Sequence, residues 1–241
     1  MPPRGFLAAT LVDFLPEGQD GMCPILQVHW TIIPATPPEP WIACGGCGNP
    51  RPFKSSGKLR LNANGKKLDA WLIYRCKSCD KTWNRTLFER RNLRDIDAGT
   101  LEALQTNDPG WIRLHAFDVE GLRRKASRID ESAEVTVMKE MISTVPGAAM
   151  IEIGLVVPVA ASIRLDRMLA SELRLSRSRL LALHERGRLV IDPARKDVLR
   201  RPPKDGTRVC LDLTGETDAN VIRSAAVRTG GRQADLPWIA S

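Results

Sequence analysis

Two Cys-x-x-Cys pairs constrain this chain more than any other feature of its sequence. Cys44 and Cys47 form the first pair, Cys76 and Cys79 form the second, and 28 residues separate them. A tight turn at each pair aims two sulfurs at one point, and a hairpin between the pairs brings the two turns together. Four thiolates in this arrangement can close a tetrahedral site around Zn²⁺. We therefore predict a structural zinc ion bound by Cys44, Cys47, Cys76 and Cys79.

Two disulfides or a redox-active Cys-x-x-Cys are the alternatives for these cysteines. Disulfides need an oxidising compartment, a redox motif needs a thioredoxin-like strand and helix, and the sequence shows neither. No histidine lies between His29 and His115 to serve as a further ligand. Because a site of four cysteines keeps no open coordination position, we expect the metal to hold structure and not to take part in catalysis.

Positive charge is concentrated in two segments of the chain. The net charge is +8, yet residues 44–83 carry +7 and residues 163–213 carry +6, so the remainder sums to −5. Two basic segments joined by a mildly acidic body predict an anionic partner, with nucleic acid as the first choice.

The N-terminal segment and the overall hydropathy predict where in the cell the protein is found. No stretch is long and apolar enough to span a membrane, and the apolar run near the N-terminus lacks a signal-peptide cleavage pattern. We therefore predict a cytoplasmic protein with no membrane partner. Residues 1–21 we interpret as a disordered leader or an over-extended start.

Residues 22–96 are predicted to form a strand at 25–33 followed by a zinc ribbon with knuckles at 44–47 and 76–79. Asn64-Gly65 is the dipeptide that tight hairpins favour, and it lies between the knuckles. Trp71, Tyr74 and Trp83 could stack on bases, but packing in the core of a small metal module is the favoured interpretation.

Residues 97–160 are predicted to be a small mixed α/β middle region. Asp97 caps an expected helix at 98–105, and Asp118 caps another at 119–129. Apolar runs near 135–141 and 150–157 predict strands. No catalytic constellation is visible in this region, and the overall fold class is predicted to be α+β.

Residues 161–214 show a helix, helix, strand pattern. Leu165, Met168, Leu169 and Leu173 recur at helical spacing. Ser176 is a good N-cap for a second helix, which Gly187 ends before a strand. Residues 215–241 are assigned to a C-terminal tail.

This segment resembles the S4 RNA-binding module, a small αL unit found in ribosomal protein S4, pseudouridine synthases and tyrosyl-tRNA synthetases. The resemblance is carried by Leu165-Asp166, Ser176-Arg177-Ser178 and Gly187, while Asp192-Pro193 stands where that family usually has Asn-Gly. It implies that the two helices present basic side chains to structured RNA, either ribosomal or transfer RNA.

Most positive residues of this segment are arginines, which bind phosphates in a bidentate manner and stack on bases better than lysines do. The expected RNA-binding residues are Arg164, Arg167, Arg174, Arg177, Arg179, Arg186 and Arg188. The main prediction is thus a zinc-containing RNA-binding protein without enzymatic activity. The alternatives are a zinc-ribbon adaptor that binds a protein partner in a transcription or translation assembly and, less favoured, an enzyme acting on RNA.

The chain as a whole also resembles an uncharacterised bacterial family known as a domain of unknown function. The resemblance rests on Cys44-Gly-Gly-Cys, on the run from Lys58 to Cys76, and on Thr82-Trp-Asn-Arg. It implies a zinc module and supplies no activity.

Overall fold

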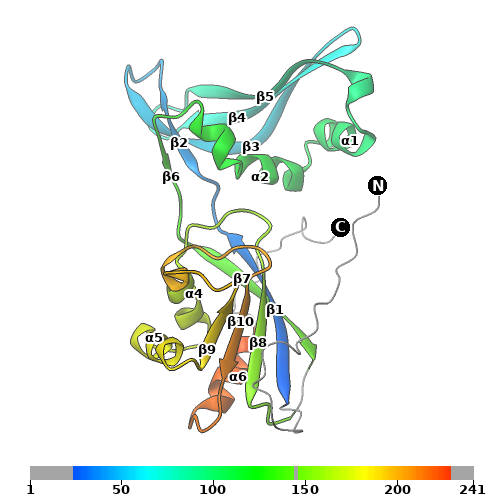
Figure 1. Cartoon of the computed structure of the whole chain (residues 1–241). Helices are drawn as coiled ribbons and strands as arrows, with labels where there is room; N and C mark the ends of the chain where they lie inside the picture. Colours follow the sequence, from blue (N-terminus) through cyan, green and yellow to red (C-terminus); the bar gives the residue numbers. More distant parts are fainter. Residues whose placement is uncertain (1–23, 144–145, 229–241) are drawn as a thin grey trace.

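Two five-stranded sheets organise the fold, and each is covered by its own helices (Figure 1). This computed structural model describes residues 24–143 and 146–228, so the expected leader at 1–21 lies outside the described residues. The described part is a mixed α+β protein with six α-helices, which confirms the predicted fold class. Among these helices, none has the length and apolar character needed to cross a membrane.

The first sheet carries the cysteines, and with its helices it forms residues 39–130, here called the cysteine lobe. Its strands, in spatial order, are β5 (Thr82–Asn92), β4 (Lys67–Cys76), β3 (Pro50–Asn64), β2 (Glu39–Ala43) and β6 (Arg128–Asp130). Its helices are the 3₁₀ turn η2 (Leu93–Asp95), α1 (Ala98–Thr106), α2 (Pro109–Ala116) and α3 (Val119–Arg123).

Strict alternation along β4 decides which side of this sheet the helices cover. Leu68, Ala70, Leu72 and Tyr74 are each no more than 5% exposed. They point to the side where α1 to α3 pack, because successive side chains of a strand point to opposite faces. Asp97, Asp108 and Asp118 begin the three helices, each accepting a hydrogen bond from a backbone N–H of the first turn.

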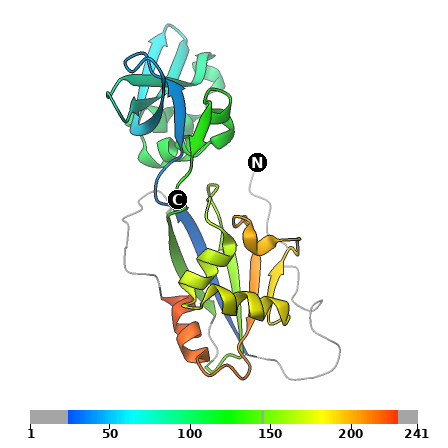
Figure 2. The same cartoon turned by 90° about the vertical axis from the view of Figure 1, so that its left-hand side faces the viewer.

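The second sheet, with three further α-helices, forms residues 24–34, 135–143 and 146–228, here called the arginine lobe. Its strands, in spatial order, are β7 (Val135–Ser143), β1 (Ile25–Pro34), β8 (Met150–Val156), β10 (Arg208–Asp212) and β9 (Leu189–Asp192). Its helices are α4 (Leu165–Glu172), α5 (Arg177–Glu185), the 3₁₀ turn η3 (Val198–Arg200) and α6 (Ala219–Val227). The α-helices lie on one side of the sheet (Figure 2).

The core of the arginine lobe lies between this sheet and its helices. Trp30 of β1 is fully buried and donates its indole N–H to the carbonyl of Ala226 in α6 at 2.8 Å. The ammonium of Lys139 lies 4.7 Å from the Trp30 ring centroid and pairs with Glu172 of α4 at 2.7 Å. These contacts tie strands and helices that are far apart in the sequence.

The chain crosses between the lobes twice, at neighbouring places. β1 runs parallel to β8 and antiparallel to β7, and Pro34 at the end of β1 faces Val135 at the start of β7. The Ala35 N–H donates to the Glu134 carbonyl at 2.9 Å, and Arg113 of α2 donates to the Pro34 carbonyl at 2.5 Å. The cysteine lobe is thus an insertion between two paired strands of the other sheet.

Three sequence expectations differ from the described elements. The helix expected at 119–129 ends at Arg123, and residues 128–130 form β6 instead. The expected tail contains α6 at 219–227. The strand at 25–34, grouped with the cysteines on sequence grounds, pairs with β7 and β8; the domain boundaries themselves stay a prediction.

Candidate metal centre and arginine cluster

Each cysteine pair occupies a tight turn at the end of a strand. After β2, the N–H groups of Cys47 and Gly48 both donate to the Cys44 carbonyl, and Gly48 has a φ of +73° that suits glycine. After β4, the Asp80 N–H donates to the Cys76 carbonyl at 3.0 Å. Because β3 pairs with β4 so that Phe53 lies opposite Cys76, the two turns meet at the same end of the sheet.

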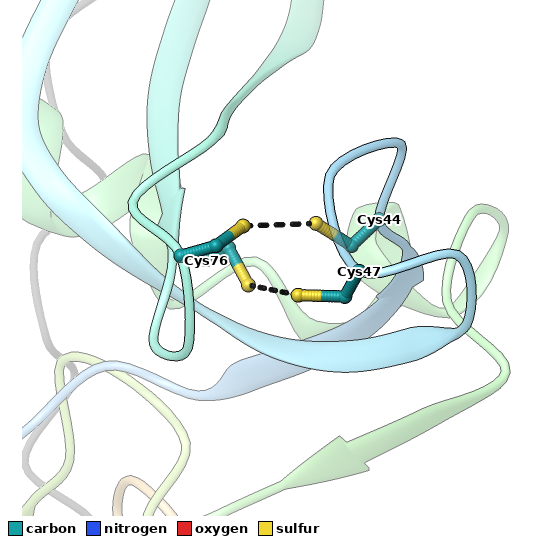
Figure 3. A group of neighbouring side chains, drawn as sticks. Cys44, Cys47 and Cys76 are labelled. Carbon is teal, nitrogen blue, oxygen red and sulfur yellow. Dashed lines mark hydrogen bonds between the residues drawn. The ribbon is translucent and has the colours of Figure 1, made fainter.

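The four sulfurs converge on one point, as the sequence spacing predicts (Figure 3). All four Sγ atoms lie within 4.8 Å of one another, with 3.4 Å from Cys44 to Cys79 and 3.9 Å from Cys47 to Cys76. A tetrahedral ion with metal–sulfur bonds of about 2.3 Å requires sulfur–sulfur distances of about 3.8 Å. A disulfide requires about 2.05 Å. The arrangement fits a metal site.

The four-cysteine centre lies at one end of the core of the cysteine lobe. Cys44 and Cys76 are buried, Cys47 is half-buried and Cys79 is exposed. The buried pair packs in the same apolar cluster as Phe53 and Tyr74. A metal ion bound here would hold the two cysteine turns together at the edge of that core.

The electrostatics of the centre follow from four thiols packed together. Burial acts to raise the pKa of Cys44, but hydrogen bonds from the backbone at Gly46 and Cys47 and from neighbouring thiols outweigh it and lower the pKa to about 6. Hydrogen bonding to Cys79, together with burial, raises the pKa of Cys47 to about 12. The sulfurs therefore do not all ionise near neutral pH on their own, and a bound divalent cation would favour the thiolate form of all four.

The seven arginines predicted to bind RNA fall into distinct environments. Asp166, the second residue of α4, is only 1% exposed and receives hydrogen bonds from Arg164 at 2.7 Å and Arg177 at 2.8 Å. The side chains of those two arginines remain 45% and 53% exposed. One buried carboxylate therefore holds two half-exposed arginines side by side at the N-terminal ends of α4 and α5.

Arg179 and Arg188 are engaged within the chain. Arg179 pairs with Glu216 and Asp218, and Arg188 pairs with Glu216 at 2.6 Å. The aspartates and glutamate of this network come from β10 and the segment before α6. These ion pairs link α5 and β9 to the C-terminal part of the chain.

The remaining three residues, Arg167, Arg174 and Arg186, are exposed. None of them forms an ion pair with another described residue. The seven predicted arginines thus fall into three groups. Arg164 and Arg177 share Asp166, an arrangement here called the Asp166 clamp; a second pair is bound to the acidic residues before α6; and three side chains are exposed without an ion pair to a described residue.

Comparison with known families gives one match. The family described as a protein of unknown function (DUF1062) matches residues 61–195, which is more than half of the chain. The chain belongs to the DUF1062 family. No curated protein and no solved structure matches it. The match begins in β3 and extends past β9, so it covers Cys76 and Cys79, the Asp166 clamp and parts of both lobes, whereas Cys44 and Cys47 precede it.

Sequence reasoning on this DUF1062 member missed the carboxylates that organise its arginines. Glu216 and Asp218 lie beyond residue 213, outside the basic segment at 163–213, so the net charge of that segment does not include them. Asp166 belongs to the helical pattern, but the pattern alone does not mark it as the partner of two arginines. Its position in the first helical turn, with Arg164 two residues earlier, was the available signal.

Proposed function

We propose that the cysteine centre holds a structural Zn²⁺ ion and that the turns and strands around it form a zinc ribbon. The sulfur spacing, the Cys₄ donor set and the position of the centre at the edge of a core support this. Four thiolates fill the coordination of the ion, so it stabilises the lobe and has no catalytic role.

We further propose that the chain is a cytoplasmic, non-enzymatic RNA-binding protein whose α4–α5 region is an S4-like module for structured RNA. The observation that carries this is the Asp166 clamp. A buried carboxylate that fixes two outward arginines reduces the conformational entropy they would lose on binding phosphate. Two positive charges against one negative charge leave a net charge of +1 at the clamp.

Helix geometry adds to this arrangement. Arg164 is the N-cap of α4 and Arg177 is the first residue of α5, so their shared partner brings two helix N-termini together. N-terminal ends carry partial positive charge and unpaired N–H groups, which favour phosphate. Arg167, Arg174 and Arg186 supply further contacts, whereas Arg179 and Arg188 act mainly through their internal ion pairs.

The test begins with purification of the protein from its own cells at low salt, a wash with rising salt, and sequencing of the released nucleic acid. We expect ribosomal or transfer RNA to be released at moderate salt, since phosphate contacts weaken steeply with ionic strength. With that RNA, Arg164→Gln combined with Arg177→Gln should lower the salt slope by about two contacts.

The matched control is Arg123→Gln, a change at an exposed arginine of α3 that pairs with Glu120 on its own helix. This variant should bind RNA like the native protein. Unchanged binding by the Arg164 and Arg177 variant at low salt contradicts the proposed surface. Protein that carries no nucleic acid, or a bound protein that resists high salt, favours the adaptor alternative.

A further inference from the structure

The cysteine-lobe sheet has a second face, opposite its helices. Along β4, the side chains that alternate with the buried ones are Lys67, Asp69, Trp71, Ile73 and Arg75, all partly or fully exposed. The helices α1 to α3 pack against the other face, and in the described residues no helix covers this one. We call this surface the open face.

Trp71 is the aromatic side chain that β4 places on the open face. Tyr74 and Trp83 pack together inside the lobe with ring centroids 5.2 Å apart, so they are core residues. Trp71 is half-buried, and the guanidinium of Arg60, its partner on β3, lies 5.9 Å from its ring centroid. An aromatic ring on an open sheet beside an arginine can stack on unpaired bases.

Unpaired positive charge lies on the same face as Trp71, further along the sheet. Lys54 of β3 faces Arg75 of β4 directly, and like charges in opposed positions destabilise a sheet. Both line a surface groove together with Lys58 and, near Cys76, Lys77. Lys77 pairs with Glu39 at 2.9 Å, but Lys54, Lys58 and Arg75 form no ion pair with any described residue.

The acidic groups of β4 and of this groove do not offset that charge. Asp69, on the open face, accepts hydrogen bonds from the Arg90 N–H at 2.6 Å and from Asn62. Asp80 is the only acidic residue among those lining the groove. The sheet thus keeps a destabilising cationic pair without an internal partner, which points to an external anion.

The distance between Trp71 and the Lys54–Arg75 pair fits a short length of single-stranded nucleic acid. Trp71 and Arg75 are four residues apart on one strand, which is about 13 Å. Asn84 and Thr86 of β5 face Ile73 and Trp71 and present polar groups between them. Stacking on Trp71 requires bases that are not paired, and duplexes do not offer them.

We propose that the open face of the cysteine lobe binds single-stranded nucleic acid, with the backbone phosphates at Lys54, Lys58 and Arg75 and a base stacked on Trp71. This goes beyond the S4-like surface proposed above, because it uses a different lobe and a different form of nucleic acid. Either proposal can fail without the other.

The test measures binding of fluorescent oligo(U) and oligo(dT) to the full metal-loaded chain by anisotropy. Trp71→Leu removes the stacking ring and should weaken binding about tenfold, whereas Trp71→Phe keeps a ring and should retain most of the affinity. Lys54→Gln with Arg75→Gln should reduce the salt slope by about two. Metal content and circular dichroism confirm that each variant is folded.

The control is Arg123→Gln, a change at an exposed arginine of α3 on the helix-covered side of the same lobe, and it should leave oligonucleotide affinity unchanged. Equal binding of both oligonucleotides assigns the site to stacking and phosphate alone, and a preference for oligo(U) adds recognition of the 2′-hydroxyl; both support the proposal. No binding at low salt, native affinity of Trp71→Leu, or ultraviolet crosslinks that map away from β3 and β4 would overturn it.

Discussion

Replacing Asp166 by asparagine tests the clamp that holds the first arginine pair. The change keeps the size of the side chain and removes its charge. In the structure, Asp166 is buried and accepts hydrogen bonds from Arg164 and Arg177. The new amide would direct N–H donors toward guanidinium groups that are donors themselves.

The expected magnitude follows from exposure. Each arginine is about half exposed, so solvent screens its ion pair, and each pair contributes roughly 0.5–1 kcal/mol. A buried amide without a matched partner costs about 1 kcal/mol more. The sum is about 2–3 kcal/mol, which corresponds to roughly 30- to 150-fold more frequent opening of the α4–α5 region.

Hydrogen-exchange mass spectrometry over peptides of α4 and α5 measures this opening. Glu185→Gln, a carboxylate-to-amide change on exposed α5 surface where no ion pair with a described residue is lost, should exchange like the native protein. Less than threefold acceleration in Asp166→Asn would refute the anchoring role.

The same prediction has a pH dependence. Burial alone would raise the pKa of Asp166, but hydrogen bonds from Arg177 and Arg164 lower it below its usual range. A depressed folded-state pKa gives stability that is present above the unfolded value of about 3.9 and lost as the pH falls through the folded value. The difference between native and variant protein should therefore shrink in acid.

Three further changes probe the cysteine lobe. A methyl group added by Gly46→Ala would lie 3.0 Å from the Cys79 sulfur, so metal affinity in a chelator competition should fall about tenfold or more. The control is Gly45→Ala, whose added methyl group meets no atom within 4 Å and which should keep native affinity. Gly121→Ala would place a methyl group against the Asp118 carboxylate and its buried partner Arg85. The free energy of unfolding, measured in urea, should fall by roughly 2–3 kcal/mol. A fall below about 0.5 kcal/mol, which is typical of a surface substitution, contradicts this contact. Removal of the metal by a chelator should abolish exchange protection in the two cysteine turns, and a turn that stays protected without metal would show that the ion is not structural.

The parts of the fold that depend on local chemistry could be predicted from the sequence. Cys-x-x-Cys turns are local, and the Asn64-Gly65 hairpin that joins them needs only neighbouring residues, so the convergence of the four sulfurs follows. Asp97 and Ser176 likewise cap α1 and α5, because an N-cap bonds N–H groups only two or three residues away.

Local signals compete in the middle region. The composition of Asn107-Asp-Pro-Gly is typical of a turn, but Asn107 ends α1 in a left-handed conformation, and Asp108 with Pro109 begins α2 at once. The helix at Val119 is cut short because the residues after Arg123 turn toward β2, where Arg128 pairs with Trp41 across the strands.

Contacts between residues far apart in the chain could not be predicted from the spacing of residues in the sequence. Arg179 lies 39 residues from Asp218, and no periodicity relates the two positions. The placement of β1 between β7 and β8 likewise depends on pairing over more than 100 residues. The pairing of Arg179 with Asp218 and the order of strands in the sheet therefore emerge only from the structure.

The insertion of one lobe between two paired strands links the metal to a sheet that does not bind it. β1 and β7 are joined through residues 35–134, where a hairpin would use about four residues. If that segment were a flexible loop, closing it would cost about 3 kcal/mol more than closing a short turn. A folded cysteine lobe keeps its two ends together and removes most of this entropic cost. Loss of the metal should therefore also loosen the pairing of β1 with β7.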